Sequence, residues 1–289
     1  MADAVVTTGT GGMEKVLLTH PDSGATSELY LHGAHVTSWR PAAGAEDVLF
    51  LSRAARFEPG QAIRGGIPVI FPQFAGRGPF VRHGFARTSF WHPLPPEIAP
   101  PVADGESAVT LRLDDSPETQ ALWPHPFRAE LTVTLAPGRL AVALAVENRA
   151  RGALEFTAAL HTYLRVDDVS EAEVTGLAGA GYESGAEGVE RAVERAEAVR
   201  VAGELDRIYH DVPTPLALRG AAGGRTVTVT ADDFADVVLW NPGPEKARTL
   251  ADLADDEWRR MLCIESAAVG RPVRLAPGAS WTGRQTLAV

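Results

Sequence analysis

Apolar and polar residues alternate along much of the chain, a pattern typical of half-buried β-strands. The clearest cases are residues 127–135 (FRAELTVTL) and 140–146 (LAVALAV), which a short turn containing proline and glycine joins. Residues 28–39 (ELYLHGAHVTSW) alternate around a break at Gly33, which indicates either a strand pair or one strand with a glycine bulge.

The same alternation predicts further, shorter strands. They cover residues 48–51, 109–113, 154–166, 170–176, 226–230 and 261–266. No fixed-period repeat, heptad pattern or long uniform helix interrupts them, and 28 glycines and 21 prolines are scattered as turns require. The sequence therefore predicts an all-β protein, an antiparallel sandwich or barrel.

Two segments fit this pattern less well. Residues 1–12 are small and polar, and we expect them to form a frayed, flexible end. Residues 186–202 (AEGVERAVERAEAVRVA) are rich in Ala, Glu and Arg, so local propensity predicts a helix. Their apolar spacing changes from helical to alternating at Val199 and Val201, so a solvated surface segment is the alternative interpretation.

Composition and charge narrow the class of protein. The 289 residues are 45% hydrophobic and 22% charged, as in globular proteins with a sizeable core. A net charge of −10 argues against nucleic-acid binding, which normally uses a broad basic face. The single cysteine, Cys263, can form no intrachain disulfide. Because the sequence shows neither a signal peptide nor a membrane-spanning stretch, we expect a cytoplasmic protein.

Residues 61–87 (QAIRGGIPVIFPQFAGRGPFVRHGFAR) reverse the overall sign of charge. Between Arg53 and Arg87 the chain carries six arginines against one acid, Glu58. Guanidinium groups donate paired hydrogen bonds to phosphate or carboxylate, and neighbouring glycines let the backbone approach a ligand closely. We interpret this segment as an anion pocket for a small phosphorylated substrate. The alternative is a turn-rich loop with solvated arginines.

His161 lies on one face of the strand predicted over residues 154–166, together with Ala159 and Tyr163. A histidine beside an aromatic ring could be a general acid, because its unperturbed pKa lies near neutrality. The alternative is a structural histidine whose hydrogen bonds are satisfied.

Glu265 shares a face with Cys263 in the strand predicted over residues 261–266 (MLCIES). A carboxylate inside an apolar strand is costly unless it is paired or used, and burial raises its pKa toward that of a useful base. The alternative is a glutamate at a strand end that reaches solvent or an arginine.

Two more side chains are candidates for substrate contacts. Asp206 could accept hydrogen bonds from sugar hydroxyls or pair with an arginine, and His83 could contact phosphate or serve structure. The sequence contains no Walker loop, no strand–GxGxxG–helix unit and no HExxH pair. We therefore expect no cofactor and no metal site.

Five segments together resemble the hexose-6-phosphate mutarotases, which are the glucose-6-phosphate 1-epimerases of the aldose 1-epimerase superfamily. They are RGGIPVIFPQF, HGFAR, LHTYLRVDD, DRIY and VVLWNPGPEKARTLADLADDEWRRMLCIESAAV, in this order. The pair WNPGPEKA and LCIESAAV is specific to this branch. The resemblance covers residues 14 to 289 and implies a single domain over residues 1–289, a large antiparallel β-sandwich of the galactose-mutarotase type with few short helices.

The resemblance also implies roles for individual residues. His161 matches the catalytic acid of the family and Glu265 its base. The predicted substrate-binding set is Arg64, Gln73, Arg82, His83, Arg87 and Asp206. Arg82 stands where relatives often carry Gln or Ser, so it either adds a phosphate contact or points outward.

The implied reaction interconverts the α and β anomers of a hexose 6-phosphate, with glucose 6-phosphate as the expected substrate. Glu265 would take the proton of the C1 hydroxyl while protonated His161 gives one to the ring oxygen. We expect a monomer that binds a phosphosugar. The alternatives are an epimerase of unphosphorylated aldoses and a non-catalytic sugar-phosphate-binding protein; the presence of both His161 and Glu265 argues against the second.

Overall fold

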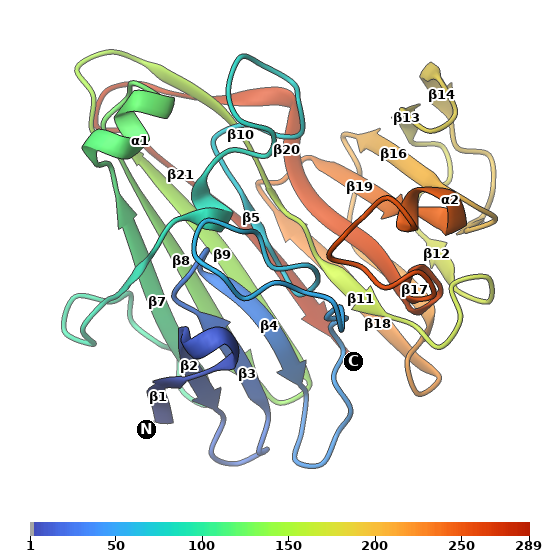
Figure 1. The fold of residues 1–289 in the computed structure, drawn as a ribbon, viewed down its shortest axis with the longest axis horizontal. Coiled ribbons are helices and arrows are strands. Elements are labelled where there is room, and N and C mark those ends of the chain that lie inside the picture. Colours follow the sequence, from blue (N-terminus) through green and yellow to red (C-terminus); the bar gives the residue numbers. More distant parts are fainter. Residues whose placement is uncertain (1–2) are drawn as a thin grey trace.

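The computed structural model describes residues 3–289, and antiparallel β-sheets make up most of it (Figure 1). A four-stranded sheet pairs β1 (Asp3–Thr8), β2 (Glu14–Thr19), β3 (Thr26–Tyr30) and β4 (His35–Arg40) in chain order. This confirms that residues 28–39 form a strand pair, and the turn at Gly33 separates the two strands.

Two larger sheets form the body of the molecule. The nine-stranded sheet runs β15 (Ala198–Arg200), β12 (Glu173–Thr175), β17 (Leu216–Ala221), β18 (Arg225–Asp232), β21 (Ser280–Ala288), β9 (Arg139–Asn148), β8 (Phe127–Ala136), β7 (Ser107–Asp114) and β6 (His92–Pro93). The eight-stranded sheet runs β14 (Val189–Val193), β13 (Gly181–Ser184), β16 (Leu205–His210), β19 (Asp236–Asn241), β20 (Met261–Leu275), β10 (Leu154–Leu160) and β5 (Val69–Ile70), with β11 (Tyr163–Arg165) also paired to β20.

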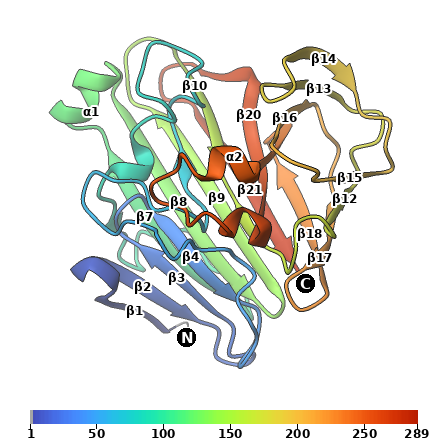
Figure 2. The same ribbon diagram turned by 45° about the vertical axis from the view of Figure 1, so that its right-hand side comes forward.

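The helices are short and lie at the surface of the sheets. They are α1 (Pro117–Leu122), α2 (Gly243–Ala247) and the 3-10 turns η1 (Thr10–Gly12), η2 (Ala86–Thr88) and η3 (Glu257–Arg260). Figure 2 shows α2 in front of the sheets. No helix in the described chain is long and apolar enough to cross a membrane. The predicted all-β sandwich with few short helices is confirmed.

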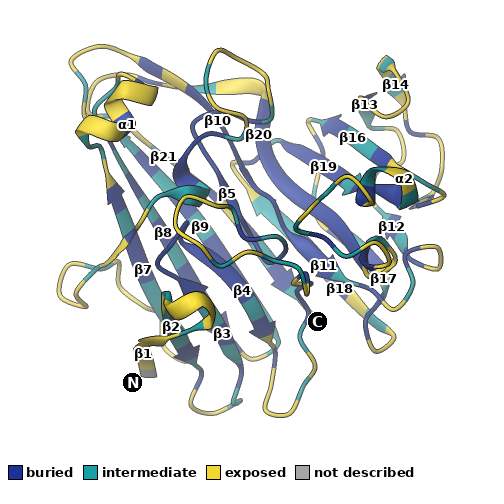
Figure 3. Cartoon of the chain, in the orientation of Figure 1, coloured by how far each residue is buried: buried dark blue, intermediate teal, exposed yellow. Residues whose placement is uncertain are grey.

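The main hydrophobic core joins the two large sheets. Leu131 of β8, Leu144 of β9 and Ile264 of β20 belong to it and are fully buried. Figure 3 shows β10 and β20 in the dark blue of buried residues, whereas α1 is yellow. Along β20, Leu262 and Ile264 face this core, while Cys263 packs in a separate cluster on the opposite side of the strand. The alternation predicted for residues 261–266 is therefore confirmed, and it leaves Glu265 on the outer face of the sheet.

Several predicted elements differ in the structure. The strand expected over residues 154–166 is interrupted at His161 and Thr162, where the chain makes a tight turn closed by the Thr162 amide donating to the Leu160 carbonyl (3.0 Å). Residues 48–51 form only isolated bridges, from Leu49 to Leu164 and from Leu51 to Gly65.

The helix that propensity predicts within residues 186–202 is wrong. The segment forms β14 and β15, two separate strands that join different sheets. Glu194 accepts hydrogen bonds from Arg207 and Tyr209, both at 2.9 Å, and these long-range contacts favour extended backbone over the local preference for helix.

The frayed end expected over residues 1–12 is also wrong for the described residues. β1 pairs with β2 from Asp3↔Thr19 to Thr8↔Glu14, and η1 follows it directly. The side chains of Val5 and Val6 are about half exposed, at 55% and 51%. The segment is ordered by backbone pairing rather than by apolar packing, so no hydrophobic pattern announces it.

Candidate active site

A pocket of about 450 Å³ opens on the outer face of the eight-stranded sheet. Its ionisable lining residues are Arg64, Arg77, Arg82, His83, Arg87, His161, Glu183, Asp206, Lys246 and Glu265. Arginine and lysine outnumber the carboxylates here, although the whole chain carries a net charge of −10. The pocket therefore concentrates positive charge that the chain as a whole lacks.

His161 and Glu265 meet at the floor of this pocket. His161 follows the last residue of β10, and Glu265 lies on the adjacent strand β20. The distance from His161 Nε2 to Glu265 Oε1 is 3.3 Å, and the side chains are 10% and 1% exposed. A histidine and a carboxylate in direct contact can pass a proton between them.

The imidazole of His161 is held by aromatic neighbours. It stacks on the ring of Tyr163, with centroids 4.8 Å apart and planes inclined by 9°. The indole of Trp240 meets it edge to face at 5.9 Å. The backbone amide of His161 donates to the Pro68 carbonyl at 3.0 Å. The ring plane is therefore set by packing rather than by a hydrogen bond.

Gln285, on β21 of the other large sheet, hydrogen-bonds to residues next to His161 and Glu265. Its side-chain amide donates to the Ile264 carbonyl at 3.2 Å and to the Ser266 hydroxyl at 2.9 Å, on either side of Glu265. Its oxygen accepts a hydrogen bond from the Thr162 hydroxyl, next to His161. One buried glutamine thus contacts the chain neighbours of both residues.

The surroundings shift the pKa values of His161 and Glu265 in opposite directions. Burial lowers the pKa of His161 well below its ordinary value, and the charges of His83, Arg64 and Arg87 lower it further. Burial raises the pKa of Glu265 well above its ordinary value, and the charge of Asp206 adds to this. In the free protein, burial therefore disfavours the charged form of both side chains.

The polar atoms of the pair that face away from each other are unpartnered. His161 Nδ1 and Glu265 Oε2 are buried and have no hydrogen-bond partner among residues 3–289. A polar ligand in the pocket would offset the cost of burying such atoms.

Two arginines form one side of the pocket. Arg64 donates from Nη1 to the Tyr163 hydroxyl at 2.9 Å and pairs through Nη2 with Asp252 at 3.1 Å. Arg87 donates to the Arg82 carbonyl at 3.3 Å. Nε of Arg64 and Nε of Arg87 are buried without a partner in the described chain. Burial lowers the pKa of Arg87, and the nearby charges of Arg64 and Arg82 lower it further.

The backbone that presents Arg64 depends on the two glycines that follow it. Gly65 and Gly66 have φ values of +108° and +61°. A Cβ atom on Gly66 would lie 2.1 Å from the Val36 carbonyl oxygen, so only glycine fits there. His35, fully buried, is hydrogen-bonded through Nε2 to the Gly65 carbonyl at 2.7 Å and holds the same turn.

His83 is a neutral donor to the pocket. Its Nδ1 accepts a hydrogen bond from the Ala75 amide at 3.3 Å, which leaves the proton on Nε2. Burial lowers its pKa to about 3, with contributions from Arg87, Arg82 and Arg64. The His83 and His161 rings are 5.9 Å apart, so a single small ligand can contact both.

Asp206, on β16, lies on the Glu265 side of the pocket. Burial raises its pKa, and Lys246, Arg82 and Arg77 oppose that rise. Lys246 of α2 is paired with Glu204 at 2.6 Å. The Asp206 side chain has no hydrogen bond to the described protein, so its oxygens are free to accept from ligand hydroxyls.

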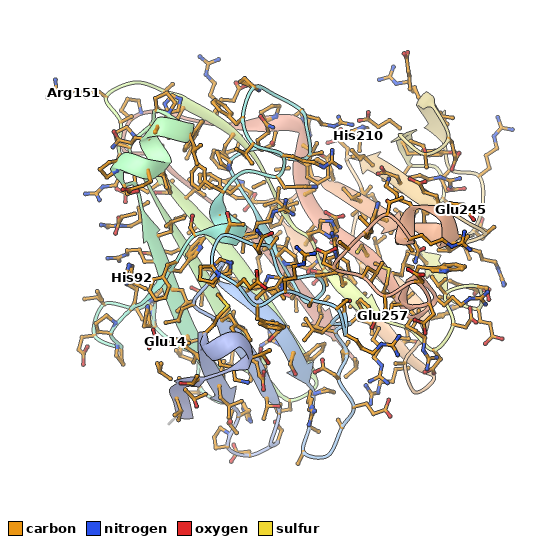
Figure 4. All side chains as sticks on the ribbon, viewed as in Figure 1. Glu14, His92, Arg151, His210, Glu245 and Glu257 are labelled. Carbon is orange, nitrogen blue, oxygen red and sulfur yellow. The ribbon has the colours of Figure 1, made fainter. Side chains whose placement is uncertain are left out.

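Residues 75–83, which we call the strap, pass over the pocket. They follow β5 at one edge of the eight-stranded sheet, yet Arg77 forms a two-point ion pair at 2.8 and 3.1 Å with Glu183 on β13, near the opposite edge. His210, labelled in Figure 4 at the end of β16, lies 3.0 Å from Glu183 and 3.3 Å from Asp236. The Arg77–Glu183 ion pair thus ties the strap to the far side of the sheet.

A model of the aldose 1-epimerase family matches residues 14–288. The chain belongs to the aldose 1-epimerase family. A protein of Cenchrus ciliaris, provisionally named glucose-6-phosphate 1-epimerase, is 38% identical over 283 residues, covering 96% of this chain and 84% of that protein. A protein of Escherichia coli K12 with the same provisional name is 32% identical over 262 residues, covering 88% and 83%. The resemblance predicted from the motifs is confirmed.

Solved structures agree on the fold. A crystal structure from Salmonella typhimurium, provisionally described as a mutarotase, aligns with a TM-score of 0.85 at 25% identity and covers 99% of this chain and 96% of that one. A galactose mutarotase related enzyme from Lactobacillus acidophilus aligns with a TM-score of 0.73 at 14% identity, covering 100% and 97%. The second likeness supports the fold alone.

Seven of the eight residues predicted for the site of this family member line the pocket: Arg64, Arg82, His83, Arg87, His161, Asp206 and Glu265. Arg82 lies exposed at the rim but faces the pocket, which favours the first of its two predicted orientations. The roles of His161 as acid and Glu265 as base stay predictions, and burial disfavours a charge on either side chain in the free protein.

Gln73 is a correction: it is not among the pocket-lining residues. Its amide group donates to the carbonyls of Ala75 and Phe80, and its oxygen accepts from the Phe80 amide at 2.9 Å. Gln73 is 3% exposed and its polar atoms are already engaged, so it shapes the strap instead of contacting substrate.

The sequence reasoning missed several residues that line or support the pocket: Arg77, Tyr163, Glu183, Trp240, Lys246 and Asp252. Arg77 belongs to the arginine cluster and could have been included with it. Tyr163 lies on the strand face predicted for His161 and could also have been included. Glu183, Trp240, Lys246 and Asp252 come from distant strands and loops, which no local pattern reports.

Proposed function

We propose that this protein interconverts the α and β anomers of a hexose 6-phosphate, with glucose 6-phosphate as the expected substrate. The observation that carries the proposal is the order of charges along the pocket. Arg64 lowers the pKa of His161 and Asp206 raises the pKa of Glu265, while the charge of Arg87 lowers both.

This order matches the connectivity of a hexopyranose. The ring oxygen is bonded to C5, which carries C6 and its phosphate, whereas C1 is bonded to C2 with its hydroxyl. An acid at the ring oxygen therefore belongs beside cations, and a base at the C1 hydroxyl belongs beside a hydroxyl acceptor. His161 and Glu265 meet these two conditions.

The chemical step needs only these two side chains. Glu265 accepts the proton of the C1 hydroxyl, the bond from C1 to the ring oxygen breaks, and the ring oxygen takes a proton from His161 Nε2. The open aldehyde rotates about the C1–C2 bond, and the reverse transfers close the ring on the other face. Both groups end in their starting protonation states.

The substrate phosphate supplies the charge that this step requires. The reactive pair has the proton on His161, whereas burial favours the neutral form of both side chains. A phosphate dianion beside Arg64 and Arg87 would offset the part of the lowering of the His161 pKa that comes from these two charges. The proton would then cross the 3.3 Å contact from Glu265 to His161. Binding of the substrate phosphate would thus also bring His161 into its proton-donating form.

The alternatives fit less well. An epimerase of plain aldoses has no need of Arg64, Arg82 and Arg87 around the acid, and a binding protein has no need of the His161–Glu265 contact. Cytoplasmic location, a monomeric state and the single domain over residues 1–289 belong to the same proposal.

Saturation-transfer NMR of anomer exchange tests it. Glucose 6-phosphate should exchange rapidly with the wild type, and His161→Ala and Glu265→Gln should each lose this activity. His92→Ala and Glu14→Gln, at positions labelled in Figure 4 that do not line the pocket, are matched controls and should keep it. Equal acceleration of plain glucose and galactose would point to a general aldose epimerase. Phosphosugar binding without exchange would leave the binding-protein alternative.

A further inference from the structure

We propose that Tyr163 is a positioning residue that links the phosphate-binding arginine to the catalytic acid. Its hydroxyl accepts a hydrogen bond from Arg64 Nη1 at 2.9 Å, and its ring stacks on His161 with centroids 4.8 Å apart. The inference rests on the proposed function, because that function assigns phosphate to Arg64 and proton transfer to His161. Among the described residues, this one ring contacts both.

The ring of Tyr163 is held firmly enough to transmit position. Its side chain is 2% exposed, and the residue pairs with Cys263 across β11 and β20. Phe50 stacks against it at 6.5 Å and Trp240 meets it edge-on at 6.1 Å. Because Phe50 and Trp240 enclose the ring, it cannot change its orientation without displacing them.

Tyr163 acts through its neighbours and does not exchange protons itself. Burial raises its pKa above the ordinary value of a tyrosine, so the hydroxyl stays neutral over the working range. A neutral oxygen is a suitable partner for a guanidinium that must keep its charge for phosphate. Asp252 holds the other Nη of Arg64 at 3.1 Å, so the arginine is supported at two points.

The hydroxyl and the ring have separable tasks. The hydroxyl aligns Arg64 and so affects how tightly the phosphate is bound, while the ring fixes the plane of His161 and so affects the chemical step. Tyr163→Phe removes only the first contact, and Tyr163→Leu removes both. A merely structural tyrosine would not divide its effects on KM and kcat in this way.

The test measures KM and kcat for glucose 6-phosphate by NMR exchange, and Kd for inorganic phosphate by titration calorimetry. Tyr163→Phe should raise KM and the phosphate Kd by roughly tenfold, because it removes one hydrogen bond to a charged group. Its kcat should stay within about twofold of the wild type, since the stacked ring remains. Tyr163→Leu should in addition lower kcat by roughly a hundredfold, because a misplaced acid loses orientation.

Tyr182→Phe is the matched control, because Tyr182 is a tyrosine of β13 that does not line the pocket, and it should change none of these values. Tyr163→Phe with an unchanged KM and phosphate Kd, or with kcat reduced as much as kcat/KM, would overturn the inference. Tyr163→Phe alone decides it if Tyr163→Leu does not fold. If the wild type exchanges no sugar, the proposed function fails, but the phosphate Kd still tests the link from Tyr163 to Arg64.

Discussion

The Nε2 atom of His161 and the Oε1 atom of Glu265 lie 3.3 Å apart, and burial disfavours a charge on either side chain. The neutral pair and the ion pair contain the same number of protons, so they differ only by a transfer across this contact. A change in the nearby field can therefore switch the pair without exchange of a proton with solvent.

This relationship predicts that phosphate activates the enzyme even when it is not attached to the sugar. Xylose is glucose without its sixth carbon and carries no phosphate. Phosphite dianion, bound beside Arg64 and Arg87, should accelerate anomer exchange of xylose by roughly tenfold or more, since each unit of pKa shift at His161 corresponds to a factor of ten. NMR exchange with and without phosphite measures this.

The controls for phosphite activation are chloride at equal ionic strength and the Arg87→Ala variant, which should both give no acceleration. Activation that persists in Arg87→Ala would mean that the effect arises elsewhere. A flat response of the wild type to phosphite would show that the phosphate acts only as an anchor.

His83 predicts a loss of stability in acid. Its folded pKa of about 3 lies below the unfolded value of 6.5, so between these values the unfolded chain binds a proton that the folded protein does not. The His83 share of stability is complete above pH 6.5 and falls by about 1.4 kcal/mol for each pH unit below it. Asn at this position can accept from the Ala75 amide and tolerates the φ of +64°.

Urea denaturation at pH 7, 6, 5 and 4 checks this prediction. His83→Asn should match the wild type near pH 7 to within about 1 kcal/mol and then lose stability less steeply as pH falls. His92→Ala, which changes an exposed histidine, should follow the wild type throughout. Parallel curves for His83→Asn and wild type would contradict the assignment of a neutral, buried His83.

The ion pair between Arg77 and Glu183 predicts that the strap can be loosened selectively. Glu183→Gln removes the charge that Arg77 and His210 share, and it should raise KM for glucose 6-phosphate by about two- to fivefold, as expected for a partly exposed ion pair. Trypsin should cleave the variant faster at Arg77 and Arg82. Glu245→Gln, which breaks an ion pair with Arg248 on α2, is the control and should not change the cleavage rate. Unchanged cleavage in Glu183→Gln would mean that the pair does not hold the strap.

Gln73 gives a prediction that separates shaping the strap from binding substrate. Gln73→Glu keeps the size of the side chain but places an acceptor opposite the carbonyls of Ala75 and Phe80. The free energy of unfolding should fall by about 1–3 kcal/mol, the cost of buried polar groups left without donors. Chemical denaturation measures this, and kcat at saturating substrate should change little. A large loss of kcat with full stability would return Gln73 to the substrate-contacting set.

The sequence predicted the parts of the site that strand alternation and the family motifs report. Alternation in residues 261–266 correctly placed Glu265 on the face opposite the core. Alternation in residues 154–166 placed His161 on the same face as Tyr163, and the two rings stack in the structure. Four of the six arginines in the cluster line the pocket, namely Arg64, Arg77, Arg82 and Arg87, and their binding of an anion stays a prediction. Contacts made across the sheet order could not be predicted: Arg77 and Glu183 are 106 positions apart, and their pairing depends on how β5 and β13 are placed in one sheet.

The protonation of the pair could not be predicted from sequence either. Part of the shift on His161 comes from His83, Arg64 and Arg87, and part of the shift on Glu265 from Asp206. These six residues come from four parts of the chain, residues 64–87, His161, Asp206 and Glu265, and only folding brings the four parts within electrostatic range. The motif assigns two catalytic residues, but the location of the proton depends on the tertiary structure.

Gln285 connects the activity of this protein to the integrity of its interior. Its side chain extends from one large sheet to the Thr162 hydroxyl beside His161, and to the Ile264 carbonyl and Ser266 hydroxyl beside Glu265. A small shift between the sheets would therefore change the separation of His161 and Glu265. The turnover rate therefore depends on how closely the two large sheets keep their packing. On heating, turnover should decline before the secondary structure is lost. Substitutions in the core, far from the sugar, would therefore be selected for their effect on the reaction rate as well as for their effect on folding.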